Sequence, residues 1–195
     1  MDLTWFNFLL FVHLACVAIW LGGGAAIQFF ALRALGSDDP GRTAAFAADV
    51  EWVGFRVFMP ASLLVLIAGI LMVVDSDFYG FGDDWVVIAL VLFAATFLFG
   101  LLFIGPESGR ISKLIEAEGP TSPAVQARVR RILALSRADL VLLYLVLYDM
   151  VLKPDFGDGW FWLGVLVAAA LAALLVWRGL NAVVGGGYSS SSTSS

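Results

Sequence analysis

The sequence has a single histidine, His13, and a single cysteine, Cys16, among 195 residues. One cysteine cannot form an internal disulfide, and the chain has neither a CxxC pair nor the cysteine and histidine spacing of a zinc site. Charged residues make up only 14% of the chain, about half the fraction typical of soluble domains. The net charge of −5 includes no cationic run that would attract nucleic acid. No phosphate loop, dinucleotide fingerprint or nucleophile–histidine–acid set is present, which excludes the active sites common in soluble enzymes.

Hydrophobic residues, in contrast, make up 61% of the chain, and the mean hydropathy is +0.94. A helix needs about 20 apolar residues to cross a bilayer, and five segments are suitable: 5–32, 57–74, 85–104, 132–152 and 160–180. We therefore predict an all-α polytopic membrane helix bundle, with four core helices and a peripheral fifth helix, within one domain over residues 1–184. The N-terminal MDLTW lacks the basic region of a signal peptide, so we expect the first segment to be retained as a span.

Basic residues gather in the first and third connections between these segments, whereas the second connection, DSDFYGFGDD, has four aspartates and no Lys or Arg. The positive-inside rule then predicts an outside N-terminus and an inside C-terminus. Ser37, Asp38 and Asp39 are candidate caps for a helix that begins at Pro40, and Ser122 is one for a helix that begins at Pro123, which predicts helix starts ahead of the second and fourth spans. Pro60 predicts a kink in the second helix. The Gly/Ser tail, 185–195, has no apolar face to bury and is expected to be disordered, whether native or an added linker.

Ionisable residues within or next to the spans need partners, because a charge inside a bilayer is costly. Only nine uncharged residues separate Asp139 from Asp149 on the fourth helix, so Arg137 and Asp139 are expected inside the cytoplasmic leaflet and Asp149 near the outer boundary. The expected cytoplasmic network consists of Arg56, Glu107, Arg110, Arg137 and Asp139. Such a network either fixes the register of the helices or serves proton movement or the binding of an anion.

His13 lies eight residues after Trp5, which places it about 12 Å into the membrane. Four interpretations stay open: a neutral imidazole hydrogen-bonded to Tyr144 or to a carbonyl, an axial ligand of haem b or another tetrapyrrole, a copper ligand, or a proton relay. The candidate haem site comprises His13, Trp20, Gly23, Gly24 and Tyr144, and the candidate copper site comprises His13, Cys16, Met72 and Met150. The glycines after Trp20 weaken the helix, which indicates either tight helix packing or a cofactor lying against bare backbone.

The segment HLACVAIWLGGGAA resembles the membrane domain of the copper-resistance protein CopD and the HemJ group of protoporphyrinogen oxidases. The span 4–154 more closely resembles a bacterial integral membrane family known as domain of unknown function 2269, through EWVGFRVFMPASLLVLIAG, GPESGRI and RILALSRADLVLLYLVLYDMVLKP. These resemblances imply a multi-pass protein of the bacterial plasma membrane. They also imply haem or porphyrin binding at His13 or a link to copper uptake.

Three functional hypotheses follow. The first is a redox or transport protein that binds haem or copper through His13. The second is a small transporter of protons or anions centred on Arg137 and Asp139. The third is a non-catalytic protein that packs against a membrane complex, or against a second copy of itself, through its glycine-rich face. The sequence leaves open whether the protein is an enzyme.

Overall fold

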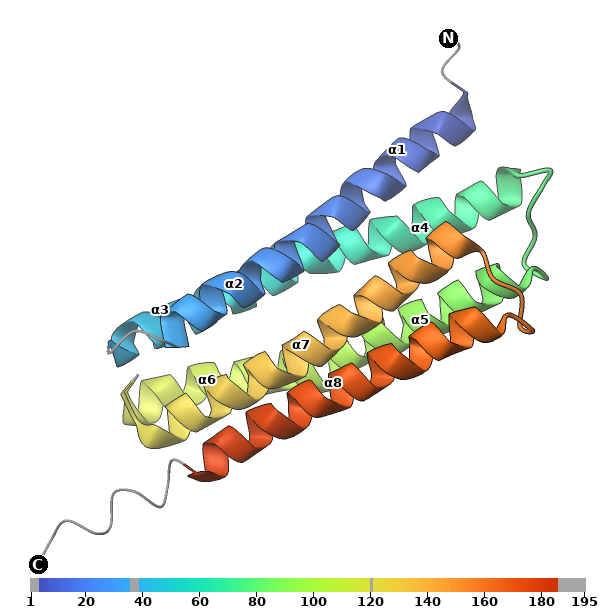
Figure 1. The fold of residues 1–195 in the computed structure, drawn as a ribbon. Coiled ribbons are helices and arrows are strands. Elements are labelled where there is room, and N and C mark those ends of the chain that lie inside the picture. Colours follow the sequence, from blue (N-terminus) through green and yellow to red (C-terminus); the bar gives the residue numbers. More distant parts are fainter. Residues whose placement is uncertain (1–3, 36–38, 120, 186–195) are drawn as a thin grey trace, which may run out of the picture.

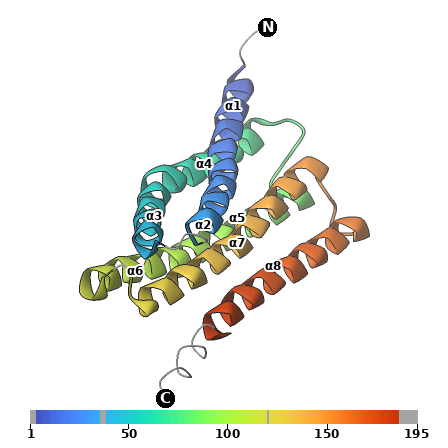
Figure 2. The same cartoon turned by 60° about the vertical axis from the view of Figure 1, so that its left-hand side comes forward.

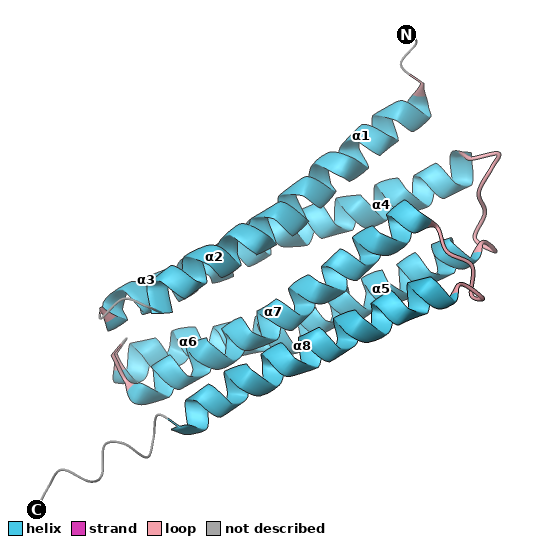
Figure 3. Ribbon diagram, in the orientation of Figure 1, coloured by secondary structure: helices cyan, strands magenta, loops and turns pink. Residues whose placement is uncertain are grey.

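The computed structural model describes residues 4–35, 39–119 and 121–185. Within these ranges the regular structure is entirely helical (Figure 3). Five continuous helices run alongside one another as an elongated bundle, with the connections at its two ends (Figure 1). Except for Gly185, the predicted disordered tail lies outside the described residues, as do the candidate caps Ser37 and Asp38.

Each of the first three helices joins two α-helical segments through a π-helical turn. The first consists of α1 (Trp5–Val17), η1 (Ala18–Gly22) and α2 (Gly23–Leu35). The second consists of α3 (Pro40–Val53), η2 (Gly54–Phe58) and α4 (Met59–Asp75). The third consists of α5 (Asp84–Phe99), η3 (Gly100–Ile104) and α6 (Gly105–Glu118). The fourth and fifth helices are α7 (Pro123–Leu152) and α8 (Gly159–Gly185).

The predicted starts of the second and fourth helices are confirmed. The Asp39 side chain accepts a hydrogen bond from the backbone N–H of Gly41, and Pro40 is the first residue of α3. The Ser122 hydroxyl likewise accepts from the N–H of Ala124 at the start of α7. These caps satisfy N–H groups that have no partner within the helix.

Two of the π-helical turns end two residues before a proline. Pro60 follows η2 and Pro106 follows η3. A proline has no N–H to donate, and its ring clashes with the carbonyl four residues earlier. A wider turn relieves that clash, and here the N–H of Met59 bonds to the carbonyl of Gly54, five residues back. The irregularity expected at Pro60 therefore takes the form of a π-helical turn.

Within the described part of the chain, four helices are long and apolar enough to cross a membrane; they cover Trp5–Ala34, Ala48–Asp75, Asp84–Glu118 and Gly159–Arg178. The helix α7 was predicted as a fifth span but does not meet this criterion, because Arg137, Asp139 and Asp149 interrupt its apolar sequence. It lies inside the bundle instead of at its edge, in contact with α2, α3, α5, α6 and α8. This central position shelters its charged groups behind the other helices.

The helix α8 lies at the edge of the bundle and packs along α7 (Figure 2). Near its start the fully buried ring of Phe161 stacks on Tyr148 of α7, with 5.5 Å between the ring centroids. Gly164 allows this approach, since a Cβ at that position would lie 3.0 Å from the Tyr148 hydroxyl. Small and aromatic residues thus hold α8 against α7.

The two ends of the bundle differ in charge. At the acidic end, the loops 76–83 and 153–158 contact each other: the Lys153 ammonium donates to the Tyr79 hydroxyl at 2.7 Å, and the Phe156 N–H donates to Asp84 at 2.8 Å. The opposite, basic end is formed by α3, α6 and the first half of α7, which carries Arg128, Arg130 and Arg131. Which end faces the cytoplasm stays a prediction from the positive-inside rule.

Candidate functional site

His13 is held in place by the backbone of a neighbouring helix. It lies on α1 with only 8% of its surface exposed, and its Nδ1 atom is 2.9 Å from the carbonyl oxygen of Val65 on α4. A carbonyl oxygen only accepts hydrogen bonds, so Nδ1 must carry the proton and donate it. The neutral ring then has its lone pair on Nε2. Metal-binding histidines are commonly oriented in this way, with the other ring nitrogen donating to a carbonyl or carboxylate.

Gly69 allows α4 to approach the imidazole closely. A Cβ at this position would lie 3.4 Å from the Cε1 atom of His13. Neither Gly69 nor Val65 was predicted from the sequence to lie next to His13. Gly69 could have been recognised as a point of close helix contact, because it interrupts the apolar run of the second span near the depth of His13. A backbone carbonyl acceptor carries no signal in the sequence at all.

His13 lines a cavity of about 400 Å³, the histidine cavity, between α1, α4, α5 and α7. This volume falls within the range of pockets for small organic ligands. Its other lining side chains are almost entirely apolar and include Trp20, Met72 and Met150. Toward the acidic end the wall includes Tyr79, Phe81, Trp85 and Lys153.

Lys153 is the only Lys or Arg among the residues that line the histidine cavity. Its ammonium lies 4.0 Å from the ring centroid of Tyr79 and 5.1 Å from that of Trp85. Such contacts with aromatic faces stabilise a cation. The cavity thus combines an imidazole, apolar walls and one positive group near the acidic end of the bundle.

The structure brings only part of each predicted cofactor set together. Trp20 lines the histidine cavity, but Tyr144 is 49% exposed and does not. Gly23 packs against the ring of Phe58, and a Cβ on Gly24 would lie 3.5 Å from Leu140. These two glycines therefore serve contacts within the bundle.

Of the predicted copper ligands, Met72 and Met150 line the same cavity as His13. Cys16 is not among the lining residues; it is buried in an apolar cluster with Ala61 and Val65. Among the described residues, no group of three or more His, Cys, Asp or Glu side chains is placed to hold a metal ion. The copper set is therefore incomplete.

A second cavity of about 480 Å³, the aspartate cavity, lies nearer the basic end, and residues of all three π-helical turns line it. Trp20 and Leu143 line both cavities and so lie between them. The polar side chains that line the aspartate cavity are Gln28, Glu51, Ser62, Thr96, Ser108, Ser136 and Asp139. No Lys or Arg is among its lining residues. The Oε1 atom of Gln28 and the Oδ1 atom of Asp139 are buried and form no hydrogen bond within the described part of the chain.

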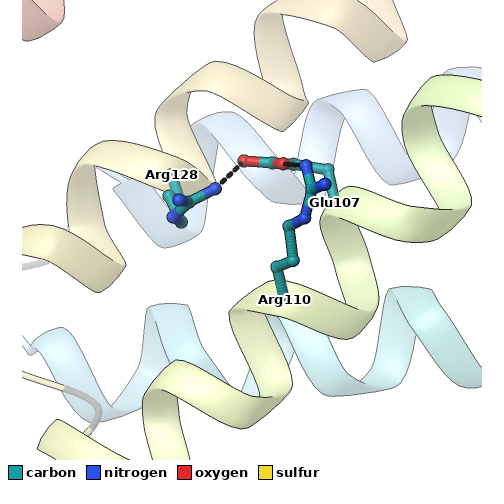
Figure 4. A network of polar contacts seen from close by, with 3 residues as sticks. All are labelled: Glu107, Arg110 and Arg128. Atoms are coloured by element: carbon teal, nitrogen blue, oxygen red, sulfur yellow. Dashed lines mark hydrogen bonds and ion pairs between the residues drawn. The ribbon is translucent and has the colours of Figure 1, made fainter.

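The predicted ionic network is only partly assembled. Glu107, which is buried beyond the predicted span 85–104, pairs with Arg110 at 3.2 Å and with Arg128 at 2.6 Å (Figure 4). The hydrogen bonds from Arg128 and Arg110 compensate the buried carboxylate for its loss of water. The pair between Glu107 and Arg128 links α6 to α7.

The other residues predicted for the ionic network do not pair with Glu107. Arg56 lies over the ring of Trp52, 5.1 Å from its centroid. Among the described residues no ion pair connects Arg56, Arg137 or Asp139 to Glu107. Arg128 was not predicted to belong to the ionic network, yet it pairs with Glu107, because one turn of α7 faces α6 at that position. Asp149 is fully buried near the end of α7, and neither of its carboxylate oxygens has a hydrogen-bond partner among the described residues.

Comparison with known proteins supports the membrane assignment. Residues 7–154 match the model of the family described as predicted integral membrane protein (DUF2269). No curated protein and no solved structure matches the chain. The expected relation to CopD and HemJ has no support among these comparisons. Because the match covers well over half of the sequence, this multi-pass integral membrane protein belongs to the DUF2269 family.

Proposed function

We propose that this protein binds a tetrapyrrole, best represented by haem b, in the histidine cavity and uses it in redox chemistry or cofactor transport. The observation that carries the proposal is the hydrogen bond from His13 Nδ1 to the Val65 carbonyl, which leaves Nε2 as a fixed basic ligand. A neutral imidazole is the usual proximal ligand of haem iron. The iron would supply the electron-transfer chemistry when bound.

The walls of the histidine cavity suit a flat apolar ring. Aromatic and aliphatic side chains surround His13, and Lys153 near the acidic end would attract the carboxylate groups of a haem. Met72 and Met150 line the same cavity, and either thioether would be able to help His13 hold the haem iron. A lone copper ion fits less well, because Cys16 is not among the residues that line the cavity.

The other two hypotheses have less support. The aspartate cavity has no Lys or Arg among its lining residues, which argues against the binding of an anion there. The glycine-rich face expected to contact a partner is partly covered within the bundle, by Phe58 at Gly23 and by Leu140 at Gly24.

We further infer that all five helices cross the membrane, with the N-terminus outside and the C-terminus inside a bacterial plasma membrane. The helix α7 connects the basic end to the acidic end, where α8 begins (Figure 1). If its four neighbours cross the bilayer, α7 must cross it as well. The basic end then lies in the cytoplasm, in accordance with the positive-inside rule.

Titration of the full-length protein with haem b tests the proposal directly. In mild detergent, we expect saturable binding of one haem per chain and a Soret band that is distinct from that of haem in empty micelles. Copper added in the same way should remain unbound at comparable concentrations, as determined by metal analysis after gel filtration. A haem spectrum identical to that in empty micelles would contradict the proposal, as would stoichiometric copper without haem.

A further inference from the structure

We propose a second ligand site: the aspartate cavity binds a bulky organic cation, of the quaternary ammonium or phosphonium class, through Asp139 and Glu51. This site is separate from the histidine cavity and does not depend on any haem bound there. The two cavities share two of their described wall residues, Trp20 and Leu143, and His13 lines the histidine cavity but not the aspartate cavity.

The charge of the cavity wall favours a cation. Asp139 and Glu51 both line it, and no Lys or Arg does. Of the arginines nearest in sequence, Arg56 lies over Trp52. Arg137, two residues before Asp139, is not among the described residues that line the cavity. Carboxylates that lack a basic neighbour inside a membrane bundle attract positive charge strongly, because little water screens them.

The hydrogen-bonding groups of the wall are mainly acceptors. The oxygens Gln28 Oε1 and Asp139 Oδ1 are buried and have no partner in the part of the chain that the structure describes, although buried polar atoms are nearly always hydrogen-bonded in folded proteins. The hydroxyls of Ser62 and Thr96 donate to the carbonyls of Met59 and Phe93 in their own helices, so each keeps its oxygen free as an acceptor. These acceptor oxygens, together with the Glu51 carboxylate, which accepts a hydrogen bond from Ser112, are complementary to a ligand that is positive or donates hydrogen bonds.

The size and aromatic content of the cavity favour an organic cation over a metal ion. Metal ions require a close shell of oxygen ligands, whereas this cavity has a volume of about 480 Å³. The aromatic rings that line it belong to Trp20, Phe55, Phe58 and Phe97. Aromatic faces bind quaternary ammonium groups through cation–π attraction. The combination of carboxylates with aromatic rings therefore matches a bulky, poorly hydrated cation.

The test uses tetraphenylphosphonium and tetraphenylborate, two probes of the same shape and opposite charge. Full-length protein in lipid nanodiscs is dialysed against each probe, with empty nanodiscs as the background. We expect saturable binding of tetraphenylphosphonium at about one per chain and no binding of tetraphenylborate above the background. Because this comparison uses the wild-type protein, it does not depend on the folding of any variant. Equal binding of both probes, or no binding of the phosphonium above background, would overturn the proposal.

Variants then locate the binding site. Asp139→Asn should weaken phosphonium binding by about tenfold or more, since a charge-assisted contact is lost, and Glu51→Gln should weaken it as well. Asp77→Asn and Glu116→Gln, which remove the same charges from exposed positions outside the cavity, should bind as the wild type does. Unchanged binding in Asp139→Asn would overturn the assignment. His13→Ala should retain phosphonium binding, so failure of the haem proposal and failure of this one are distinguishable.

Discussion

Replacing His13 with alanine is expected to abolish haem binding while the bundle stays folded. The change removes the only imidazole in the chain and with it the Nε2 ligand. Loss of a residue that merely orients a metal ligand lowers affinity about 10- to 100-fold, so we expect loss of the ligand itself to lower haem affinity by more than about 100-fold. Haem titration of the variant, followed through the Soret band, measures this effect.

Cys16→Ala is the matched control. Cys16 is on the same helix and is as buried as His13, at 8% exposure, but it does not line the histidine cavity. The Cys16→Ala variant should bind haem as the wild type does. The fold should tolerate His13→Ala, since the bond to Val65 contributes only about 1 kcal/mol. Equal haem affinity in wild type and His13→Ala, with helicity unchanged by circular dichroism, would rule out His13 as the ligand.

Replacing Phe161 with alanine is expected to release the start of α8 from α7. The side chain is fully buried and stacks on Tyr148, with an angle of 9° between the ring planes. Truncation of a buried phenylalanine leaves a cavity and costs about 3 kcal/mol or more. We expect the free energy of unfolding to fall by this amount, as measured by denaturation in detergent mixtures monitored by circular dichroism.

The neighbouring Trp160 provides the control for this change. Its side chain is 80% exposed, so Trp160→Ala should change the free energy of unfolding by less than about 0.5 kcal/mol. If both alanine variants unfolded at the same denaturant concentration as the wild type, the packing of α8 described above would be incorrect. A lower free energy of unfolding in Trp160→Ala alone, with that of Phe161→Ala unchanged, would lead to the same conclusion.

The sequence predicted the helices well because their signals are local. Apolar runs set the four spans that the structure supports, and Asp39 and Ser122 cap helices where expected. The position of α7 was also indicated by its polar residues, since a helix with Arg137 and Asp139 is poorly suited to face lipid on all sides.

The arrangement of side chains around each helix was harder to predict. The rise of 1.5 Å per residue sets the depth of a side chain in the membrane, but the face it occupies depends on how each helix is rotated against its neighbours. Tyr144 was assigned to the depth of His13, yet it is half exposed and does not line the histidine cavity. Glu107 and Arg110 are one turn apart and their pairing was expected, whereas the pairing with Arg128 depends on the packing of α6 on α7.

Nitrogen NMR of isotopically labelled histidine, with the protein in lipid bilayers, tests the central claim most directly, because His13 alone contributes a signal. The structure predicts that Nδ1 carries the proton and Nε2 does not. Addition of haem b should then shift or broaden the Nε2 resonance while Nδ1 stays protonated. A proton on Nε2 with none on Nδ1, or an Nε2 signal unchanged by excess haem, would contradict the assignment of His13 as a haem ligand.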